Sequence, residues 1–262
     1  MNTDSPTSRS TASKAPDASH GEIEVSGFET MADSMEFADN YNRWILSKFL
    51  PVMGTSLLEI GTGQGNFKKY VDGRVANYVS LDIDEKVIER ARARDPKGKY
   101  EVADISKRSC LELKARFSFD SIICVNVLEH VPDHRSGLHH MLELLEPGGH
   151  LLLFVPSFMH LYNDLDRLAG HLRRYRKRDV RDLLPVEGGF ELVRCEYFNP
   201  VGAVGWLANK FAKHKNINSQ NVNSQVQMFD RYLVPLSRLL NPLTSRFWGQ
   251  SLVCVIRKQA VI

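Results

Sequence analysis

The sequence predicts an α/β domain built on a doubly wound sheet, and two observations carry this prediction. The apolar run from Ser56 to Ile60 leads directly into three alternating glycines, Gly61, Gly63 and Gly65. Glycine adopts left-handed conformations without a Cβ clash, so this strand–turn–helix junction lets backbone approach a ligand closely. Strand-like and helix-like segments then alternate through residues 56–156, which is typical of a parallel sheet.

The elements follow in a regular order along the chain. Residues 28–50 place aromatic and aliphatic side chains at mixed three- and four-residue spacing, which predicts an amphipathic helix ahead of the sheet. Strands are predicted at residues 56–60, 77–82, 99–103, 119–126, 146–156, 189–198 and 251–257. After the second strand, Asp84 suits a helix N-cap, and Val87, Ile88 and Ala91 recur at helical spacing.

Acidic residues stand where the first two strands end. Glu59 lies two residues before the first glycine, and Asp82 closes the second strand. A carboxylate at that tip is placed to accept hydrogen bonds from both ribose hydroxyls of an adenosine cofactor. The loop departs from the dinucleotide fingerprint G-x-G-x-x-G, because Asn66 holds the position of the third glycine.

These landmarks, with the strand ending at Asn126 and the Pro-Gly-Gly turn before the fifth strand, resemble the class I S-adenosylmethionine-dependent methyltransferases. The resemblance covers roughly residues 28–258 and implies a seven-stranded, Rossmann-like sheet whose last strand inserts antiparallel beside the sixth. It also implies S-adenosyl-L-methionine as the cofactor, with Asp104 facing the adenine amino group. The cofactor-binding residues implied in this way are Glu59, Gly61, Gly63, Gly65, Asp82, Ile83, Asp104, Ile105 and Asn126.

About fifty residues separate the last two predicted strands, which no hairpin needs, and long connections of this kind are usually functional. We therefore treat residues 199–250 as a helical cap inserted in a methyltransferase domain that spans residues 28–262. The insertion is apolar at both ends, and its prolines break it into short helices. It suits a lid over the acceptor pocket, and it also suits a dimer surface or a membrane-interface patch.

A second unusual block, residues 161–179, follows the fifth strand, where this fold places acceptor-binding residues. Arginine pairs bidentately with carboxylate or phosphate, so Arg173 and Arg174 suit an anionic or polar acceptor, and structural anchoring of the loop is an equal alternative. With the insertion, the block resembles the type 11/12 methyltransferases of glycan, lipid and specialised-metabolite pathways. The predicted acceptor-binding residues are Tyr162, Arg173, Arg174, Tyr175 and Trp206.

The predicted reaction is a displacement at the sulfonium methyl group, for which a hydroxyl acceptor must also lose a proton. His130, at the end of the fourth strand, is the first candidate base, and His171 is the second. The pair Glu129-His130 also suits a plain cap of the next segment, and a neutral amine or a carboxylate acceptor needs no strong base. No histidine or cysteine spacing marks a metal site, so no metal is predicted.

Composition narrows the remaining possibilities. A length of 262 residues allows one or two domains, and a net charge of +3 is too small to imply a nucleic-acid or membrane partner by itself. The four cysteines form no C-x-x-C pair and suit buried thiols in a reducing compartment, and no apolar run is long enough to span a bilayer. Residues 1–27 are expected to be a disordered tail, because their start is rich in Ser, Thr, Ala and Pro and lacks a signal-peptide core.

We therefore expect a cytoplasmic monomer or homodimer whose partner is a small-molecule acceptor. A nucleic-acid substrate is disfavoured, because no N/D-P-P-Y motif follows the fourth strand. An NAD-dependent oxidoreductase would share the glycine loop and Asp82, although it should show the longer fingerprint. A non-catalytic binding protein would share the fold, although the intact loop and both cofactor carboxylates favour an enzyme.

Overall fold

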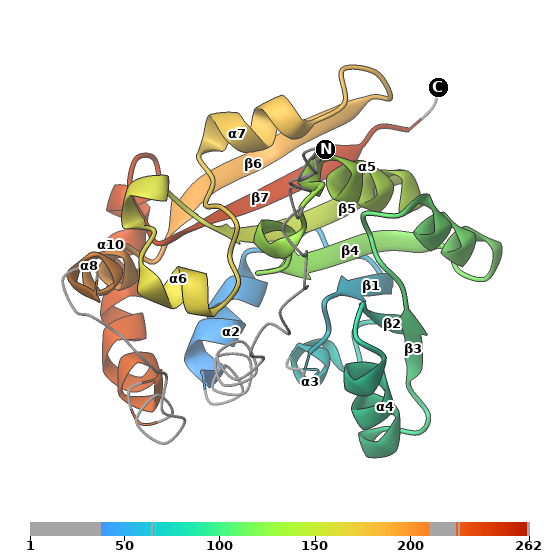
Figure 1. The fold of residues 1–262 in the computed structure, drawn as a ribbon, viewed down its shortest axis with the longest axis horizontal. Helices are drawn as coiled ribbons and strands as arrows, with labels where there is room; N and C mark the ends of the chain where they lie inside the picture. The colour runs from blue at the N-terminus through green and yellow to red at the C-terminus, as the bar shows by residue number, and fades with distance from the viewer. Residues whose placement is uncertain (1–37, 64, 66, 210–223, 225, 261–262) are drawn as a thin grey trace, which may run out of the picture.

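A computed structural model describes residues 38–63, 65, 67–209, 224 and 226–260. Seven strands form one sheet in the order β3-β2-β1-β4-β5-β7-β6 (Figure 1). The strands are β1 (Ser56–Ile60), β2 (Asn77–Asp82), β3 (Lys99–Val102), β4 (Phe119–Val125), β5 (Leu145–Pro156), β6 (Phe190–Phe198) and β7 (Ser251–Lys258). All neighbours pair in parallel except β7, which is antiparallel to both β5 and β6. The predicted antiparallel insertion of the last strand is confirmed.

Because β7 is antiparallel to both of its neighbours, β6 runs parallel to β5. The insertion that follows β6 therefore leaves the sheet at its carboxyl edge, the edge where the loops after the parallel strands also gather. This direction places the insertion on the side of the sheet where the sequence analysis expects the acceptor.

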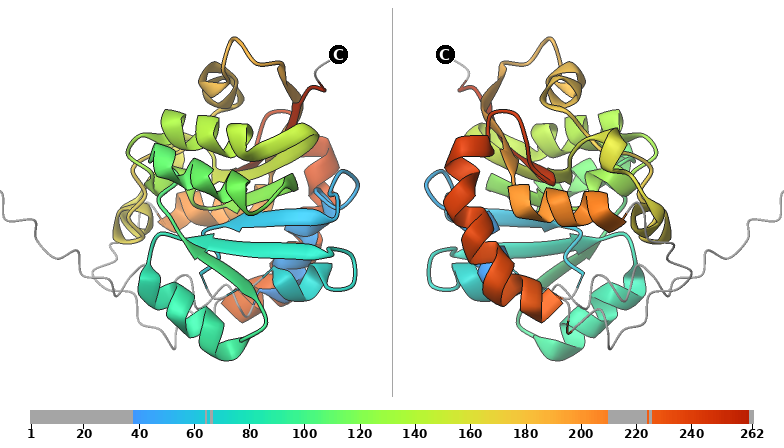
Figure 2. Two further views of the ribbon diagram at one scale, coloured as in Figure 1. Left: turned by 90° about the vertical axis from the view of Figure 1, so that its right-hand side faces the viewer. Right: turned by 90° about the vertical axis from the view of Figure 1, so that its left-hand side faces the viewer.

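Helices cover both faces of the sheet (Figures 1 and 2). The helices are α2 (Asp39–Ser47), α3 (Lys68–Val71), α4 (Glu85–Arg94), α5 (His134–Leu144), α6 (Asp164–Leu168), α7 (Lys177–Leu183), α8 (Pro200–Asn209) and α10 (Val234–Thr244). Shorter turns are η2 (Arg108–Ala115), η3 (Leu128–His130), η4 (Met159–Leu161) and the π turn η5 (Phe229–Leu233). Asp84 caps α4 as predicted, since its carboxylate accepts a hydrogen bond from the Lys86 amide at 2.8 Å.

Two apolar clusters, one on each face, hold these helices to the sheet. Successive strand residues point to opposite faces, so Ile122 of β4 packs with α5 and α7 whereas Ile123 packs with α2, α3 and α10. The second cluster is aromatic, with Trp44 and Phe198 rings 3.8 Å apart. The doubly wound architecture is thus confirmed, with the central strands buried on both faces.

Element boundaries differ little from the sequence predictions. The predicted helix over 28–50 appears as α2, and its part before residue 38 lies outside the described residues. Strands β3 to β7 each differ from their predicted bounds by one residue at one end. Lys177, at the start of α7, is half-buried and donates hydrogen bonds to the carbonyls of Ser245 and Arg246. Across the described residues, no helix is long and apolar enough to cross a bilayer.

Among the described residues, three non-glycine residues adopt left-handed backbone conformations, and each lies within two residues of the end of a strand at the carboxyl edge. Asn126 (φ 52°) follows β4, Phe158 (φ 61°) follows β5 and Asn199 (φ 63°) follows β6. Such conformations cost about 1–2 kcal/mol and concentrate at functional sites. The sharp turns at this edge therefore mark where the site is built.

Candidate active site

The glycine loop turns the chain from β1 toward α3 beside open space. Gly61, Gly63 and Gly65 have φ values of 70°, 49° and 75°, which favour glycine. A Cβ at Gly61 would collide with the Val127 side chain, whereas a Cβ at Gly63 or Gly65 would meet no atom of the described residues within 4 Å. The loop therefore presents bare backbone to a space that a ligand could enter, which fits the close approach of a cofactor.

Asp82 faces this loop from the tip of β2. Its carboxylate accepts hydrogen bonds from the Gly63 amide at 3.1 Å and from the Asp84 amide at 3.0 Å. The next residue, Ile83, is 67% exposed, which is unusual for an isoleucine beside a sheet. A carboxylate at the strand tip and an exposed apolar side chain next to it suit the ribose and the base of an adenosine.

Glu59 lies underneath the loop and is buried. Its Oε2 accepts hydrogen bonds from the Thr62 hydroxyl at 2.7 Å and the Tyr78 hydroxyl at 2.8 Å. Burial raises the pKa of Glu59 to about 7, although both hydrogen bonds act to lower it. The contacts of Glu59 give it a supporting position for the loop, since Thr62 belongs to that loop.

The other predicted cofactor residues lie at the same edge. The Asp104 carboxylate accepts a hydrogen bond from the Ser106 amide at 2.8 Å, and Asn126 begins the turn after β4. Ile105 is different, because its side chain is buried in the core and packs against Gly137 of α5. Because its side chain is buried in the core, Ile105 could contact a cofactor only through its backbone atoms.

The segment after β5 is organised around one buried carboxylate, that of Asp166. It accepts hydrogen bonds from His171 Nδ1 (2.7 Å), Arg174 Nε (2.8 Å) and Trp206 Nε1 (3.0 Å). Burial acts to raise the pKa of Asp166, but the hydrogen bonds and the charge of Arg174 outweigh it, so the pKa lies below its ordinary value. We call Asp166, His171, Arg174 and Trp206 the Asp166 network.

The predicted acceptor-binding side chains are engaged with the protein itself. Arg174 is buried, and its guanidinium is held by Asp166 and the Ser157 carbonyl. The Arg173 guanidinium donates to the carbonyls of Val131 and Pro132. The hydroxyls of Tyr162 and Tyr175 donate to the carbonyls of His171 and Leu128. These contacts favour the anchoring alternative for the arginines, and acceptor contacts by these residues stay a prediction.

Glu129 and the two candidate bases meet at the end of β4. The His171 Nε2 atom lies 3.8 Å from Glu129 Oε1, and the rings of His130 and His171 are 4.8 Å apart, edge to face. Glu129 is fully buried, and among the described residues neither of its carboxyl oxygens has a hydrogen-bond partner. Burial raises the pKa of Glu129 to about 7, and burial with the nearby His171 lowers the pKa of His130 to about 4.

This cluster has two chemical capacities. Ligand atoms of Glu129, His130 and His171 all lie within 4.8 Å of one another, so a carboxylate and two imidazoles could hold a divalent cation. The same groups can accept a proton, because Asp166 holds the Nδ1 proton of His171 and leaves its Nε2 as an acceptor facing Glu129.

Sequence reasoning did not select Asp166 or Glu129 as site residues. Asp166 carries a local pattern, since Asn163 and Asp166 form a capping box at the start of α6. Such a box predicts where a helix starts. It does not predict which side chains from later in the sequence contact Asp166 in the folded protein. Glu129 has no local pattern that could find it, because His171 reaches it from a distant segment.

The sheet with its antiparallel β7, the glycine loop and the acidic tip of β2 define a class I S-adenosylmethionine-dependent methyltransferase. The methyltransferase domain family matches residues 32–194, more than half of the chain. The chain therefore belongs to this family, and S-adenosylmethionine is its cofactor. A dinucleotide oxidoreductase, which would share the glycine loop, is not supported by this match.

Individual relatives agree with the class. The ubiquinone biosynthesis O-methyltransferase of Erwinia tasmaniensis is 30% identical over 108 residues, which are 40% of this chain and 44% of that protein. The match thus spans less than half of that relative's length. The protein of the same name from Photorhabdus laumondii is 28% identical over 71% of this chain and 74% of its own.

Solved structures show the same fold at low sequence identity. The S-adenosylmethionine-dependent methyltransferase of Archaeoglobus fulgidus superposes with a TM-score of 0.55 at 17% identity, over 84% of this chain and 94% of that one. This similarity extends to the sheet and its helices. It does not identify the acceptor, which has to be inferred from the residues of this chain.

We predict that Asp82→Ala weakens binding of S-adenosylhomocysteine by about 1.5–3 kcal/mol, the usual loss for hydrogen bonds to a charged group. Isothermal titration measures this change. Asp84→Ala is the matched control, because its carboxylate caps α4 next to the site and contacts no loop glycine. Equal affinities for Asp82→Ala and the unaltered chain would show that the ribose site is misplaced.

We predict that Asp166→Ala lowers the free energy of unfolding by roughly 3–5 kcal/mol, because it leaves the Arg174 charge buried without its partner. Urea unfolding measures the loss. Asp164→Ala, an exposed acid on the same helix, should change stability by about 0.5 kcal/mol at most. If Asp166→Ala lowered the free energy of unfolding no more than Asp164→Ala does, the Asp166 carboxylate would not be the stabilising contact that we infer.

The raised pKa of Glu129 predicts that the free energy of unfolding depends on pH. Its folded-state pKa of about 7 lies above its ordinary value of 4.5, so this group's favourable contribution is complete below pH 4.5 and is lost as the pH rises through 7. Glu129→Gln removes the titration and should gain stability relative to the unaltered chain by roughly 3 kcal/mol across this range. Urea unfolding with a chelator present compares the two chains, and parallel pH profiles would refute the shift.

Proposed function

We propose that this methyltransferase O-methylates a small-molecule acceptor that carries an ionisable hydroxyl. The observation that carries the proposal is His171, held between Asp166 and Glu129 at the carboxyl edge of the sheet. A methyl transfer to a hydroxyl needs a proton acceptor near the reacting oxygen, whereas transfer to a carboxylate does not. Two relatives bear the name O-methyltransferase, which supports oxygen as the accepting atom.

The proton acceptor is best described as the His171–Glu129 pair with His130 beside it. Because the Asp166 carboxylate accepts the hydrogen bond of His171 Nδ1–H, the Nε2 lone pair of His171 is directed to the Glu129 carboxyl, 3.8 Å away, and is free to accept a proton from the acceptor. The Glu129 pKa of about 7 is well matched to a base that works near neutral pH. With a pKa of about 4, His130 is neutral there and can orient the hydroxyl or pass its proton on.

The cofactor would be held by the glycine loop, Asp82 and Ile83. Two observations support this: the space beside the loop is open, and the Asp82 carboxylate faces the loop. Bound S-adenosylmethionine supplies an activated methyl group. The chain's own residues then position the acceptor and take its proton, and α8 helps to exclude water as a wall that Trp206 fixes to the Asp166 network.

The acceptor we propose has a polar or phenolic head and an apolar body. The head would meet His130 and His171, while the body would lie along the Phe158, Tyr197 and Trp248 rings, which stack with centroids 4.5–5.6 Å apart at the end of β5. Methyl transfer to phenols with and without an apolar tail, compared with matched carboxylates and amines, tests this preference. Turnover confined to the carboxylates would remove the need for a base and refute the proposal.

We predict that His171→Ala and His130→Ala each lower kcat, by roughly 10²–10⁴ for whichever residue takes the proton in the transition state. Affinity for S-adenosylhomocysteine should hold, because neither residue touches the glycine loop. His150→Ala, on the sheet away from the carboxyl edge, is the control and should keep its turnover. Near-normal turnover in His130→Ala with loss in His171→Ala would assign the proton to the Glu129 pair and reduce His130 to a cap.

A further inference from the structure

An apolar stripe on α10 and the turns flanking it faces away from the protein. Its members are Tyr232, Leu236, Leu239, Leu240, Leu243 and Phe247, which we call the outer stripe, and all are exposed, with Leu239 and Leu243 each 74% exposed. Their spacing puts the α10 leucines within one arc of about 100° on the helix surface. Figure 2 shows α10 along the outside of the molecule, in the view that faces the left-hand side of Figure 1.

The inner face of this helix is largely polar. The buried residues of α10 are Val234, Ser237 and Asn241, and Asp230 is buried in the preceding turn η5. Asp230 accepts hydrogen bonds from the amides of α2, at 2.8 Å from Tyr41, and the Asn199 amide donates to the Asn241 side chain at 3.0 Å. A surface helix ordinarily turns its apolar face inward. Here Val234 and the hydrogen bonds attach the helix to the protein, and the exposed leucines are left for a partner outside it.

Charge identifies the partner. Residues 199–250 contain one acid, Asp230, and it is buried and hydrogen-bonded to α2. The same stretch contains six lysines and arginines, of which Arg231, Arg238 and Arg246 are exposed beside the outer stripe. A second copy docked through the same face would bring these arginines together with no acid from the stretch to neutralise them. An anionic surface neutralises them directly.

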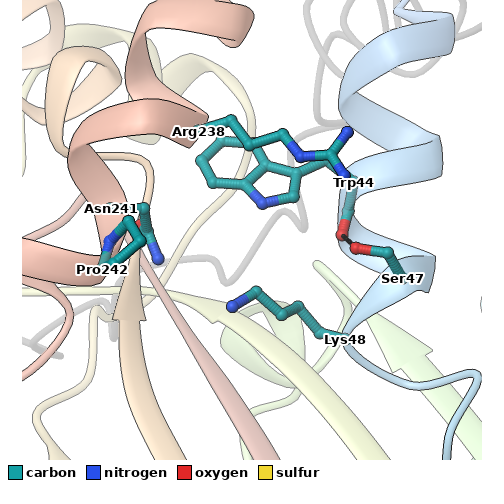
Figure 3. A pocket seen from close by; sticks show the side chains of 6 residues that line it. All are labelled: Trp44, Ser47, Lys48, Arg238, Asn241 and Pro242. Carbon is teal, nitrogen blue, oxygen red and sulfur yellow. Dashed lines mark hydrogen bonds between the residues drawn. The ribbon is translucent and has the colours of Figure 1, made fainter.

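A groove next to the stripe adds a place for an anionic group. It has a volume of about 310 Å³ between α2 and α10, and it is lined by Trp44, Ser47, Lys48, Arg238, Asn241 and Pro242. Figure 3 shows Arg238 and Trp44 on the two sides of the groove, α10 and α2, with the Lys48 ammonium reaching into it. Lys48 also pairs with Glu196 at 2.8 Å. Glu196 thus offsets the charge of Lys48, and Arg238 is the cation of the groove that suits the phosphate of a lipid headgroup.

We propose that the outer stripe and its arginines dock the protein on a bilayer that contains anionic lipid, with α10 lying in the plane of the interface. A helix with leucines and aromatic rings on one side and arginines at its flank binds such surfaces through buried apolar area plus attraction to anionic headgroups. The groove beside Arg238 accepts a headgroup phosphate. This docking is independent of the acceptor and of the proton acceptor proposed above.

Sedimentation of the full chain with vesicles tests the proposal. We expect binding to vesicles of phosphatidylcholine mixed with phosphatidylglycerol, weakening with salt, and little binding to phosphatidylcholine alone. Arg238→Gln with Arg246→Gln should lower the partition coefficient roughly thirtyfold at low salt. Leu239→Gln with Leu243→Gln should lower it by about tenfold or more. The controls Val186→Gln and Arg108→Gln change an exposed apolar residue and an exposed cation on other elements and should bind as the unaltered chain does.

Thermal unfolding and S-adenosylhomocysteine affinity, unchanged in every variant, show that the fold is intact, and the vesicle measurement needs no acceptor. The proposal is overturned if the unaltered chain does not bind the anionic vesicles. It is also overturned if the arginine variant and the leucine variant bind them as strongly as the unaltered chain does. A dimer that the leucine variants dissociate, with no vesicle binding, would assign the stripe to a second copy. Binding of free glycerol phosphate at Arg238 without vesicle binding would make the groove a small-anion site instead.

Discussion

The loop after α6 and the insertion after β6 are held together by a single buried carboxylate, that of Asp166. Three side chains from these two segments donate to it: His171 and Arg174 from the loop after α6, and Trp206 from α8. Burying a carboxylate beside a guanidinium is costly unless every partner is in place, and here the hydrogen bonds fill the available positions. The same interaction therefore fixes the tautomer of His171 and joins the insertion to the loop.

The carboxyl edge of the sheet is shaped by strained turns that the rest of the structure holds. Asn199 illustrates how, because its left-handed backbone ends β6 while its side chain binds three elements. Its Oδ1 accepts from the Gly202 amide and the Ser237 hydroxyl, and its Nδ2 donates to Gln250 just before β7. An asparagine tolerates this conformation better than most residues, and its amide satisfies both donors and acceptors locally.

The local arrangement of the glycine loop and Asp82 could be predicted from the sequence, whereas the contacts of the predicted acceptor residues could not. Gly61 and Gly63 follow β1 directly and Asp82 ends the next strand, so their placement follows from local order along the chain, and their contacts with the cofactor stay a prediction. Arg174 and Trp206 have the residue types of ligands, yet in the fold they face a carboxylate inside the protein. Glu129 became informative only when the distant His171 lay beside it. Contacts between residues far apart in the chain produce no periodic pattern or fixed spacing that could be recognised in the sequence.

In the proposals above the insertion takes two of the roles that its sequence suggested, because its helices α8 and α10 face opposite ways. Trp206 directs α8 inward to the Asp166 network, while α10 is fastened to α2 and to Asn199 by its polar side. Hydrogen bonds are directional, so this attachment fixes the rotation of α10 about its axis more sharply than apolar contact would. The outward aim of Leu239 and Leu243 is therefore a consequence of Asp230, Ser237 and Asn241, and the stripe can change without disturbing the site behind α8.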